Sequence, residues 1–248
     1  MIEIDKIHNM DCLEGMKLIP DGSVDAVICD LPYGTTANKW DVLIPFDSLW
    51  SCYKTVCKPN AAVILFGQTP FYAQVVMSNV NWFRHEWIWE KEKGLGFLNA
   101  EESPMKAHEN VAVFCKNGEK LTYNPQMTKG QPYKHRLCRK AANYGFDSDK
   151  GYEIKEYSGD RYPTDMLFYP IVRHPFHPTQ KPVDLIRYLI RTYTNEGDTV
   201  LDNCMGSGTT AVACIKEKRH FIGFELNKEY FDKATKRIKA EQSQLCLF

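Results

Sequence analysis

Four consecutive residues, Asp30-Leu31-Pro32-Tyr33, place a carboxylate, a proline and an aromatic ring directly after an apolar run. That run, residues 26–29, is typical of a buried strand, and an irregular loop follows Tyr33. In open α/β sheets, ligands bind at the carboxyl ends of the strands. Pro32 fixes its own φ and moves Leu31 out of the α region, so the turn is stiff. An ordinary strand end with a surface tyrosine fits equally well, and these four residues alone leave both interpretations open.

A second group of residues suited to ligand binding lies near the end of the chain. A short strand, predicted at 199–202, is followed by a small-residue loop, 203–210, that holds Gly206 and Gly208. Glycines let the backbone approach a ligand, and the next helix offers free N–H groups. Glu225 follows at about the distance at which an acid binds a ribose diol in dinucleotide folds. We interpret this as a nucleoside pocket rather than a simple tight turn. Asp202 would repel a phosphate, which favours S-adenosylmethionine, whose amino group it would face.

The composition indicates an ordinary globular protein of one sizeable domain, or one domain with an insertion. The 248 residues include 31 basic and 31 acidic side chains, so only a local patch would indicate a nucleic-acid partner. The start of the chain lacks a signal-peptide pattern, and the apolar runs are far shorter than a membrane span, so we expect a cytoplasmic protein. Nine cysteines without Cys-x-x-Cys spacing fit reduced thiols, and the histidines show no metal-ligand grouping, so no metal is predicted.

Strand and helix patterns alternate along most of the chain, which predicts an α/β sheet. Asp11 precedes a short helical pattern, so it is either a helix N-cap or a ligand contact. Residues 91–105 are polar and glycine-rich and are predicted as a loop. Strands are predicted over 2–7, 24–29, 61–67, 82–89, 108–115, 199–202 and 220–225, and further helices over 46–56, 71–77, 183–190, 211–218 and 229–240.

The segment 116–172 differs from the rest, because its periodicity fades and tyrosines, glycines and prolines accumulate. Residues 116–140 include seven basic side chains and one acid, and seven of the thirteen tyrosines lie between Tyr123 and Tyr169. Basic residues interleaved with aromatic rings suit phosphates and base faces, although a solvated, partly disordered insertion is the alternative. The basic residues that we predict to contact DNA are Lys39, Lys129, Lys134, Arg136, Arg139 and Lys140.

Three motifs together resemble a known family. Residues 30–33 resemble the (Asp/Asn/Ser)-Pro-Pro-(Tyr/Phe/Trp) catalytic motif of amino-methyltransferases, and residues 202–210 resemble their cofactor loop, Asp-Pro-Phe-x-Gly-Ser-Gly-Thr-Thr. Residues 177–182 match the His-Pro-Thr-Gln-Lys-Pro signature of DNA methyltransferases letter for letter. The order of the motifs is similar to that of the β group of DNA N6-adenine and N4-cytosine methyltransferases. The resemblance spans nearly the whole chain except the segment 116–172.

The resemblance implies a Rossmann-like, mostly parallel, doubly wound sheet with a circularly permuted motif order. It implies a catalytic half at 1–115, a target-recognition insert at 116–172 and a cofactor-binding half at 173–248. Double-stranded DNA is the implied partner, and a homodimer is common in this group. The implied catalytic residues are Asp30, Leu31, Pro32 and Tyr33, and the implied contacts to S-adenosylmethionine are Asp11, Asp30, Thr179, Lys181, Asp202, Cys204, Gly206, Gly208, Thr209, Glu225 and Leu226.

The reaction that the resemblance implies is direct methyl transfer to the exocyclic amine of a base flipped out of the duplex. Asp30 and the Leu31 carbonyl would accept the amine N–H bonds, and Tyr33 would stack on the base. Leu31 replaces the usual proline but keeps its carbonyl, and Cys204 replaces a phenylalanine; we expect changed affinity rather than lost activity.

An aspartate at the first position of the catalytic motif favours adenine N6 over cytosine N4 in this family. Two other classes are a protein glutamine methyltransferase, whose cofactor loop precedes the catalytic motif, and a DNA-binding module with an inactive site. The intact Asp30, Tyr33, Asp202 and Glu225 count against the inactive module.

Overall fold

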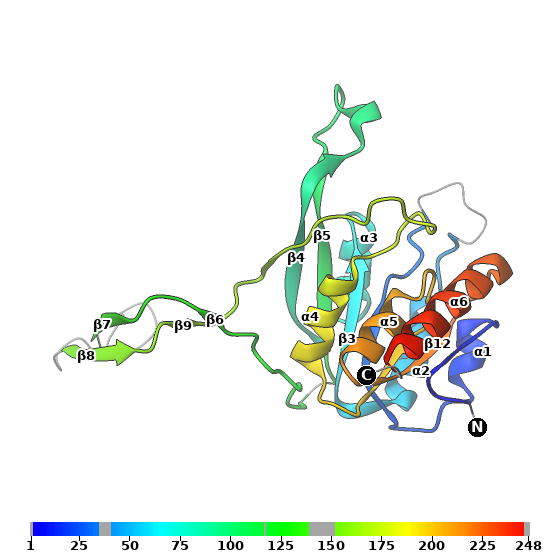
Figure 1. Ribbon diagram of the computed structural model, residues 1–248, viewed down its shortest axis with the longest axis horizontal. Coiled ribbons are helices and arrows are strands. Elements are labelled where there is room, and N and C mark those ends of the chain that lie inside the picture. Colours follow the sequence, from blue (N-terminus) through cyan, green and yellow to red (C-terminus); the bar gives the residue numbers. More distant parts are fainter. Residues whose placement is uncertain (1, 35–40, 117, 139–151, 246–248) are drawn as a thin grey trace. The chain divides into compact units, whose positions relative to one another are not determined.

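The computed structural model describes residues 2–34, 41–116, 118–138 and 152–245 of the chain. These residues form two compact units, one made of residues 1–124 and 165–248, and a smaller one made of residues 125–164. The smaller unit is shorter at both ends than the insert predicted at 116–172. The larger unit carries an eight-stranded sheet with helices on both faces (Figure 1).

The sheet of the larger unit is mostly parallel, as predicted. All of its strands share one direction except β5, which runs antiparallel to both of its neighbours. The strand order is β1 (Lys6–His8), β12 (His220–Phe224), β11 (Thr199–Asp202), β2 (Val24–Cys29), β3 (Cys57–Gly67), β5 (Lys106–Phe114), β4 (Phe83–Leu95) and β10 (Met166–Phe168).

The central strands alternate buried side chains between the two faces, and each face has its own core. Ile28 and Ile64 point to one face, and Val27 and Val63 point to the other. The helices α4 (Val183–Tyr193), α5 (Thr209–Lys216) and α6 (Lys228–Leu245) pack on the first face (Figure 1), whereas α1 (Cys12–Met16), α2 (Phe46–Val56) and α3 (Phe71–Ser78) pack on the second. The predicted doubly wound fold is therefore confirmed.

Several predicted boundaries were wrong for reasons that the structure makes clear. Strand β1 starts only at Lys6, although a strand was predicted over 2–7, and β3 starts at Cys57, four residues before the strand predicted over 61–67. The largest error is residues 91–95, predicted as loop, which continue β4 because β5 supplies an antiparallel partner as far as the pair Leu95 and Lys106. The resulting hairpin extends beyond the sheet (Figure 1), and exposed Phe97 and Leu98 lie beyond its last paired residues, in the short 3-10 helix Phe97–Asn99.

The smaller unit contains strands that the fading periodicity of segment 116–172 did not predict. It contains two antiparallel ribbons, β6 (Thr128–Lys129) with β9 (Asp160–Arg161) and β7 (Tyr133–Cys138) with β8 (Tyr152–Tyr157). A two-stranded ribbon has little buried surface, so its sequence lacks the apolar alternation that identifies a strand in a larger sheet. Cross-strand contacts hold it instead, including the stacked rings of Tyr133 and Tyr157 with centroids 4.9 Å apart.

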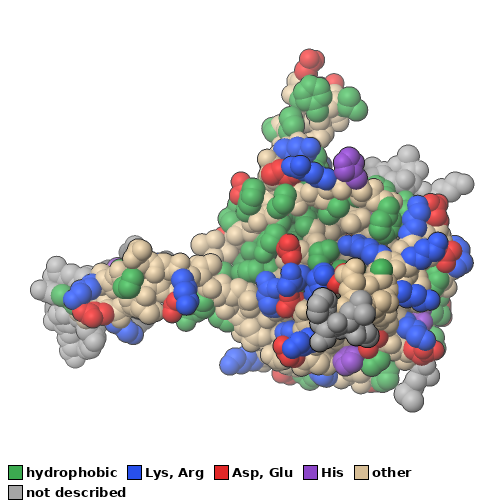
Figure 2. All heavy atoms as spheres, in the orientation of Figure 1, with side chains coloured by type: hydrophobic (Ala, Val, Ile, Leu, Met, Phe, Trp, Pro, Cys, Tyr) green, Lys and Arg blue, Asp and Glu red, His purple; other side chains and the backbone are tan. Residues whose placement is uncertain are grey.

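The surface of the described residues agrees with the neutral net charge. Figure 2 shows basic and acidic side chains interspersed over the face that α4, α5 and α6 cover. Within the described ranges, none of the helices is both long and apolar enough to cross a membrane, and the same residues contain no cluster of histidine, cysteine or acidic side chains suited to a metal ion. The cysteines with described side chains are free thiols.

Candidate active site

The site lies where the helical connections change from one face of the sheet to the other. The neighbouring parallel strands β2 and β11 lead to helices on opposite faces, α2 and α5. At such a switch point the loops diverge and leave a crevice at the carboxyl ends of the strands. A cavity of about 460 Å³ lies there, and both Asp30, directly after β2, and Asp202, the last residue of β11, line it.

The segment Asp30-Leu31-Pro32-Tyr33 borders this cavity and is held from both sides. The Tyr33 hydroxyl donates a hydrogen bond of 2.8 Å to Asp30 Oδ1, and the Tyr33 ring stacks on Phe71 with centroids 4.7 Å apart. Leu31 is buried, which anchors the turn in the core beneath. The carboxylate and the ring are thus fixed in orientation before any ligand binds, as an aligning site requires.

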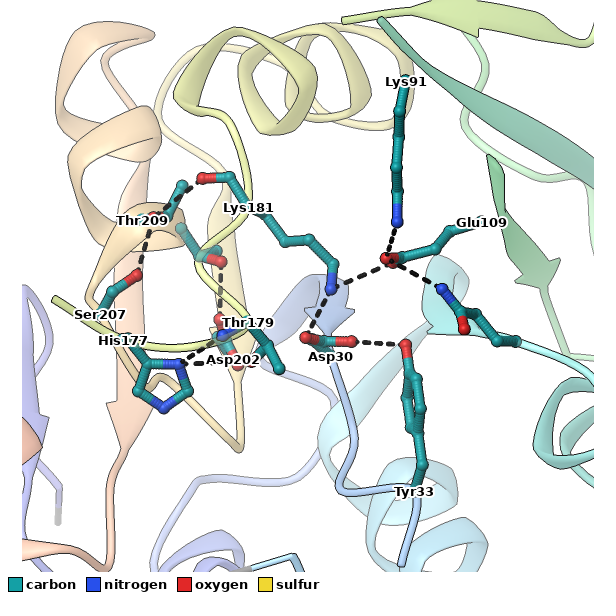
Figure 3. A network of polar contacts seen from close by, with 12 residues as sticks. Asp30, Tyr33, Lys91, Glu109, His177, Thr179, Lys181, Asp202, Ser207 and Thr209 are labelled. Atoms are coloured by element: carbon teal, nitrogen blue, oxygen red, sulfur yellow. Dashed lines mark hydrogen bonds and ion pairs between the residues drawn. The ribbon is translucent and has the colours of Figure 1, made fainter. Parts of the chain in front are cut away.

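Lys181 reaches Asp30 from the segment that precedes α4. Its Nζ donates a hydrogen bond of 2.6 Å to Asp30 Oδ2 and lies 3.2 Å from Glu109 Oε2 (Figure 3). Burial opposes the charge of Lys181, but the two carboxylates outweigh it and raise the pKa of the ammonium group. Burial raises the pKa of Asp30, with Lys181 acting against that rise. Lys181 therefore points at the proposed catalytic carboxylate, although its predicted role was in holding the cofactor.

Asp202 is the most deeply buried acid of the cavity. Thr210 Oγ1 donates a hydrogen bond of 2.6 Å to Asp202 Oδ2, and the Cys204 N–H donates one of 3.1 Å to Oδ1. Burial raises the pKa of Asp202 to about 7, against the lowering effect of these two hydrogen bonds. The Asp202 carboxylate therefore holds the loop in shape through these hydrogen bonds. A cation in the cavity would stabilise its ionised form.

Glu225 holds the loop after Asp202 from the end of the next strand, β12. Its carboxylate accepts a hydrogen bond of 2.8 Å from the Gly206 N–H and one of 2.7 Å from the Asn227 N–H. Gly206 has a φ of +51°, and a Cβ there would lie 3.3 Å from the ring of His177. Glycine is therefore favoured at Gly206 both by the left-handed backbone conformation and by the close approach of the His177 ring.

The structure brings nearly all the predicted cofactor contacts to this one cavity. Asp11 lines it and is also the N-cap of α1, accepting from the Leu13 and Glu14 N–H groups. Gly208 is the exception among the predicted contacts, because it does not line the cavity and packs against Ala234 and Ile238. The remaining predicted contacts that line it are Thr179, Lys181, Cys204, Gly206, Thr209, Glu225 and Leu226.

Sequence reasoning missed some residues of the site. His177 lines the cavity, and burial lowers its pKa to about 4, with the charge of Lys181 adding to this, so it is neutral at pH 7. Phe66, at the end of β3, also lines the cavity. Lys91 and Glu109 form a buried ion pair of 2.7 Å beside Lys181. The only available signal for that pair was a lysine and a glutamate near the ends of two predicted strands.

Most of the predicted DNA contacts lie in the segment 116–172, whereas Lys39 lies in the sequence between Tyr33 and Asp41, two residues that line the cavity. Lys129 is an exposed residue of β6, and Lys134 of β7 forms an ion pair of 2.5 Å with Glu156 of β8. The positive charge counted along residues 116–140 is therefore partly offset by the strand that pairs with it. Arg136 belongs to β7, whereas Lys39, Arg139 and Lys140 lie outside the described residues.

Comparison with known proteins identifies the family of the chain. The family model described as DNA methylase (N6_N4_Mtase) matches residues 24–236. The type II methyltransferase M1.MboII of Moraxella bovis is 30% identical and covers 94% of this chain and 96% of its own length. The type II methyltransferase M.HpaI of Haemophilus parainfluenzae is 28% identical over 93% of this chain and 73% of its own length. The chain therefore belongs to the N6/N4 DNA methylase family.

Solved structures show the same fold. The M1.HpyAVI–SAM complex matches with a TM-score of 0.64 and 25% identity, covering 94% of this chain and 98% of that one. The cytosine-N4-specific PvuII DNA methyltransferase matches with a TM-score of 0.67 at 16% identity, covering 96% and 91%, which supports the fold alone.

Proposed function

We propose that this DNA methyltransferase moves a methyl group from S-adenosyl-L-methionine to the N6 amine of adenine in double-stranded DNA. The observation that carries the proposal is that Asp30 and the loop between Asp202 and Glu225 line one cavity. A methyl donor and an acceptor amine must meet at one point for direct transfer. The choice of adenine rests on the aspartate at the first position of the catalytic motif.

The cofactor is S-adenosyl-L-methionine, and the donor set of the cavity fits it. A buried acid at Asp202 suits an ammonium group, and Glu225 suits a ribose diol, as in dinucleotide folds. Asp11, Thr179 and Thr209 supply further polar atoms on the cavity wall. When bound, this cofactor supplies an activated methyl group on a positively charged sulfur.

The protein's own contribution is to align the acceptor amine. The lone pair of an exocyclic amine is delocalised into the ring, so the amine is a poor nucleophile until its geometry changes. Asp30 and the Leu31 carbonyl accept its two N–H bonds and favour a pyramidal nitrogen whose lone pair faces the methyl group. The nitrogen gains the methyl group as the carbon–sulfur bond breaks, and Asp30 is the base in position to accept the surplus proton.

Tyr33 receives the extruded base. Flipping a base costs a few kcal/mol of stacking and pairing, and stacking on an aromatic ring returns about 1–3 kcal/mol. Phe71 supports the Tyr33 ring, and Asp30 fixes its hydroxyl, so little side-chain freedom is left to lose on binding. The ribbons of residues 125–164 serve as the target-recognition element, with Lys129 among the phosphate contacts.

Transfer to cytosine N4 is the second candidate, because the family model that matches the chain covers both N6 and N4 methylases. The test incubates the protein with methyl-labelled cofactor and genomic DNA that has been amplified in vitro, so that it carries every sequence without modification. Digestion to nucleosides and mass spectrometry then identifies the product. We expect labelled N6-methyladenine, and labelled N4-methylcytosine without N6-methyladenine would overturn the choice of base.

A further inference from the structure

Beside the proposed catalytic carboxylate lies a second ion pair that the mechanism above does not use. Lys91 of β4 and Glu109 of β5 have side chains that are 2% and 10% exposed, and Lys91 Nζ lies 2.7 Å from Glu109 Oε1. Removing two charges from water costs several kcal/mol per ion, and an apolar pair of similar size is often no less stable. Stability alone therefore does not explain why the fold buries this pair beside the cavity.

The pair is linked to Asp30 through Lys181. Glu109 Oε2 lies 3.2 Å from Lys181 Nζ, which in turn donates a hydrogen bond of 2.6 Å to Asp30 Oδ2. Figure 3 shows the resulting row of alternating charges, which we call the charge row and define as Asp30, Lys181, Glu109 and Lys91. Lys181 also lies over the rings of Phe66 and Trp89, so its ammonium group has little room to move.

Charged and titratable groups face Asp30 from several elements. Tyr33 comes from its own loop, Cys29 from β2, Lys181 from the segment before α4, Glu109 from β5 and Asp202 from β11. His177 is close enough to Lys181 for that charge to lower its pKa, and it is neutral. Lys181 is thus the cation paired directly with Asp30 among the described residues, and Glu109 shares it.

We infer that Glu109 and Lys91 are positioning residues that set the charge state of Asp30 during methyl transfer. Glu109 holds the Lys181 ammonium between two carboxylates, so that Asp30 keeps accepting capacity for the substrate amine. Lys91 balances Glu109 and limits the negative charge that Asp30 experiences. The inference rests on the role of Asp30 in the proposed function, but it is tested by different residues.

The two partners should act on Asp30 with opposite signs. Asp30 accepts the amine N–H bonds only when it is ionised, so the rate falls as pH drops through the pKa of Asp30. Glu109→Gln removes a negative charge near Asp30, and the acidic limb of the rate profile should move down by about one pH unit. Lys91→Met leaves the negative charge of Glu109 without its lysine partner at position 91, and the acidic limb should move to higher pH by a similar amount. A purely structural role would lower the rate without opposite shifts.

The experiment measures single-turnover methyl transfer from labelled S-adenosylmethionine to unmodified amplified DNA between pH 5 and 9. Glu86→Gln is the matched control for Glu109→Gln, because Glu86 lies on β4 and bonds Tyr72 and Asn110 instead. Lys58→Met is the control for Lys91→Met, because Lys58 pairs with Asp25. We expect both controls to keep the wild-type limb.

Opposite shifts in the two variants support the inference, and unchanged limbs or shifts in the same direction overturn it. If either single variant fails to fold, the double variant Lys91→Met/Glu109→Gln removes both charges together. The acidic limb of its rate profile should lie close to that of the wild type. A limb displaced by one pH unit or more in that double variant also overturns the inference. Asp30→Ala separates the two proposals, because its retained activity would refute the proposed function itself.

Discussion

Replacing Asp202 by asparagine should stabilise the cofactor-free protein while weakening cofactor binding. The carboxylate is 4% exposed, and burial raises its pKa to about 7 from the usual 3.8. Asparagine has nearly the same shape, and its amide can accept from the Cys204 N–H and donate to Thr210 Oγ1, so both hydrogen bonds have a replacement. The substitution therefore changes the charge and leaves the loop intact.

The sign and size of this effect follow from proton linkage. The folded protein holds the Asp202 proton more tightly than the unfolded chain, so the contribution to stability is fully present below about pH 4 and is lost as pH rises to about 7. At about 1.4 kcal/mol per pKa unit, the complete loss is about 4 kcal/mol. Asp202→Asn should remove that loss. The free energy of unfolding of the variant should therefore exceed that of the wild type by up to about 4 kcal/mol above pH 7 and equal it near pH 4.

Urea unfolding followed by tryptophan fluorescence at pH 4.5 and pH 8 measures the difference directly. Asp21→Asn, in an exposed turn, is the control and should leave stability within about 0.5 kcal/mol at both pH values. Titration calorimetry should show S-adenosylmethionine binding at least tenfold more weakly to Asp202→Asn, since the neutral amide no longer attracts a cation. An Asp202→Asn variant less stable than the wild type at pH 8, or a stability difference independent of pH, would show that burial of the Asp202 charge does not destabilise the fold.

Three further substitutions test separate parts of the site. Tyr33→Ala should lower kcat/KM for duplex DNA by roughly 10–100-fold because it removes the stacking surface, whereas Tyr33→Phe keeps the ring and should lose tenfold or less; equal losses in steady-state assays would argue against stacking. Gly206 has a φ of +51° and lies against His177, so Gly206→Val should lower the free energy of unfolding by about 1–2 kcal/mol and weaken cofactor binding in calorimetry. Unchanged cofactor binding would exclude Gly206 from the cofactor pocket. Lys129→Ala should weaken DNA binding to all sequences and reduce the salt slope by about one, with exposed Lys239→Ala on α6 as the control, and an unchanged slope would remove Lys129 from the interface.

Much of the site was predictable because its determinants are local in the sequence. The apolar run before Asp30 and the strand before Asp202 each identify a strand end, and parallel strands bring their carboxyl ends to one edge. The spacing from Gly206 to Glu225 fits a strand–turn–helix–strand unit, and the structure joins these two residues by a hydrogen bond. Local pattern was sufficient for these positions because neighbouring residues decide the backbone there.

The remaining features depend on contacts between distant segments. Lys181 and Asp30 are 151 positions apart, and the sequence does not show that the lysine turns to the carboxylate. Residues 90–95 are mostly polar or glycine, and only the partner strand β5 makes them a strand that buries Lys91. The ribbons of residues 125–164 are stabilised by pairs such as Tyr133 and Tyr157, which no sequence period identifies.

The most direct test of the catalytic role of Asp30 is the Asp30→Ala variant, with cofactor binding and methyl transfer measured on the same preparation. Calorimetry should show that the variant binds S-adenosylmethionine within a few-fold of the wild-type affinity. Single-turnover transfer to unmodified amplified DNA should fall by about a hundredfold or more, because the amine loses the carboxylate that aligns it. Near-normal transfer by Asp30→Ala would contradict the assignment of the catalytic site.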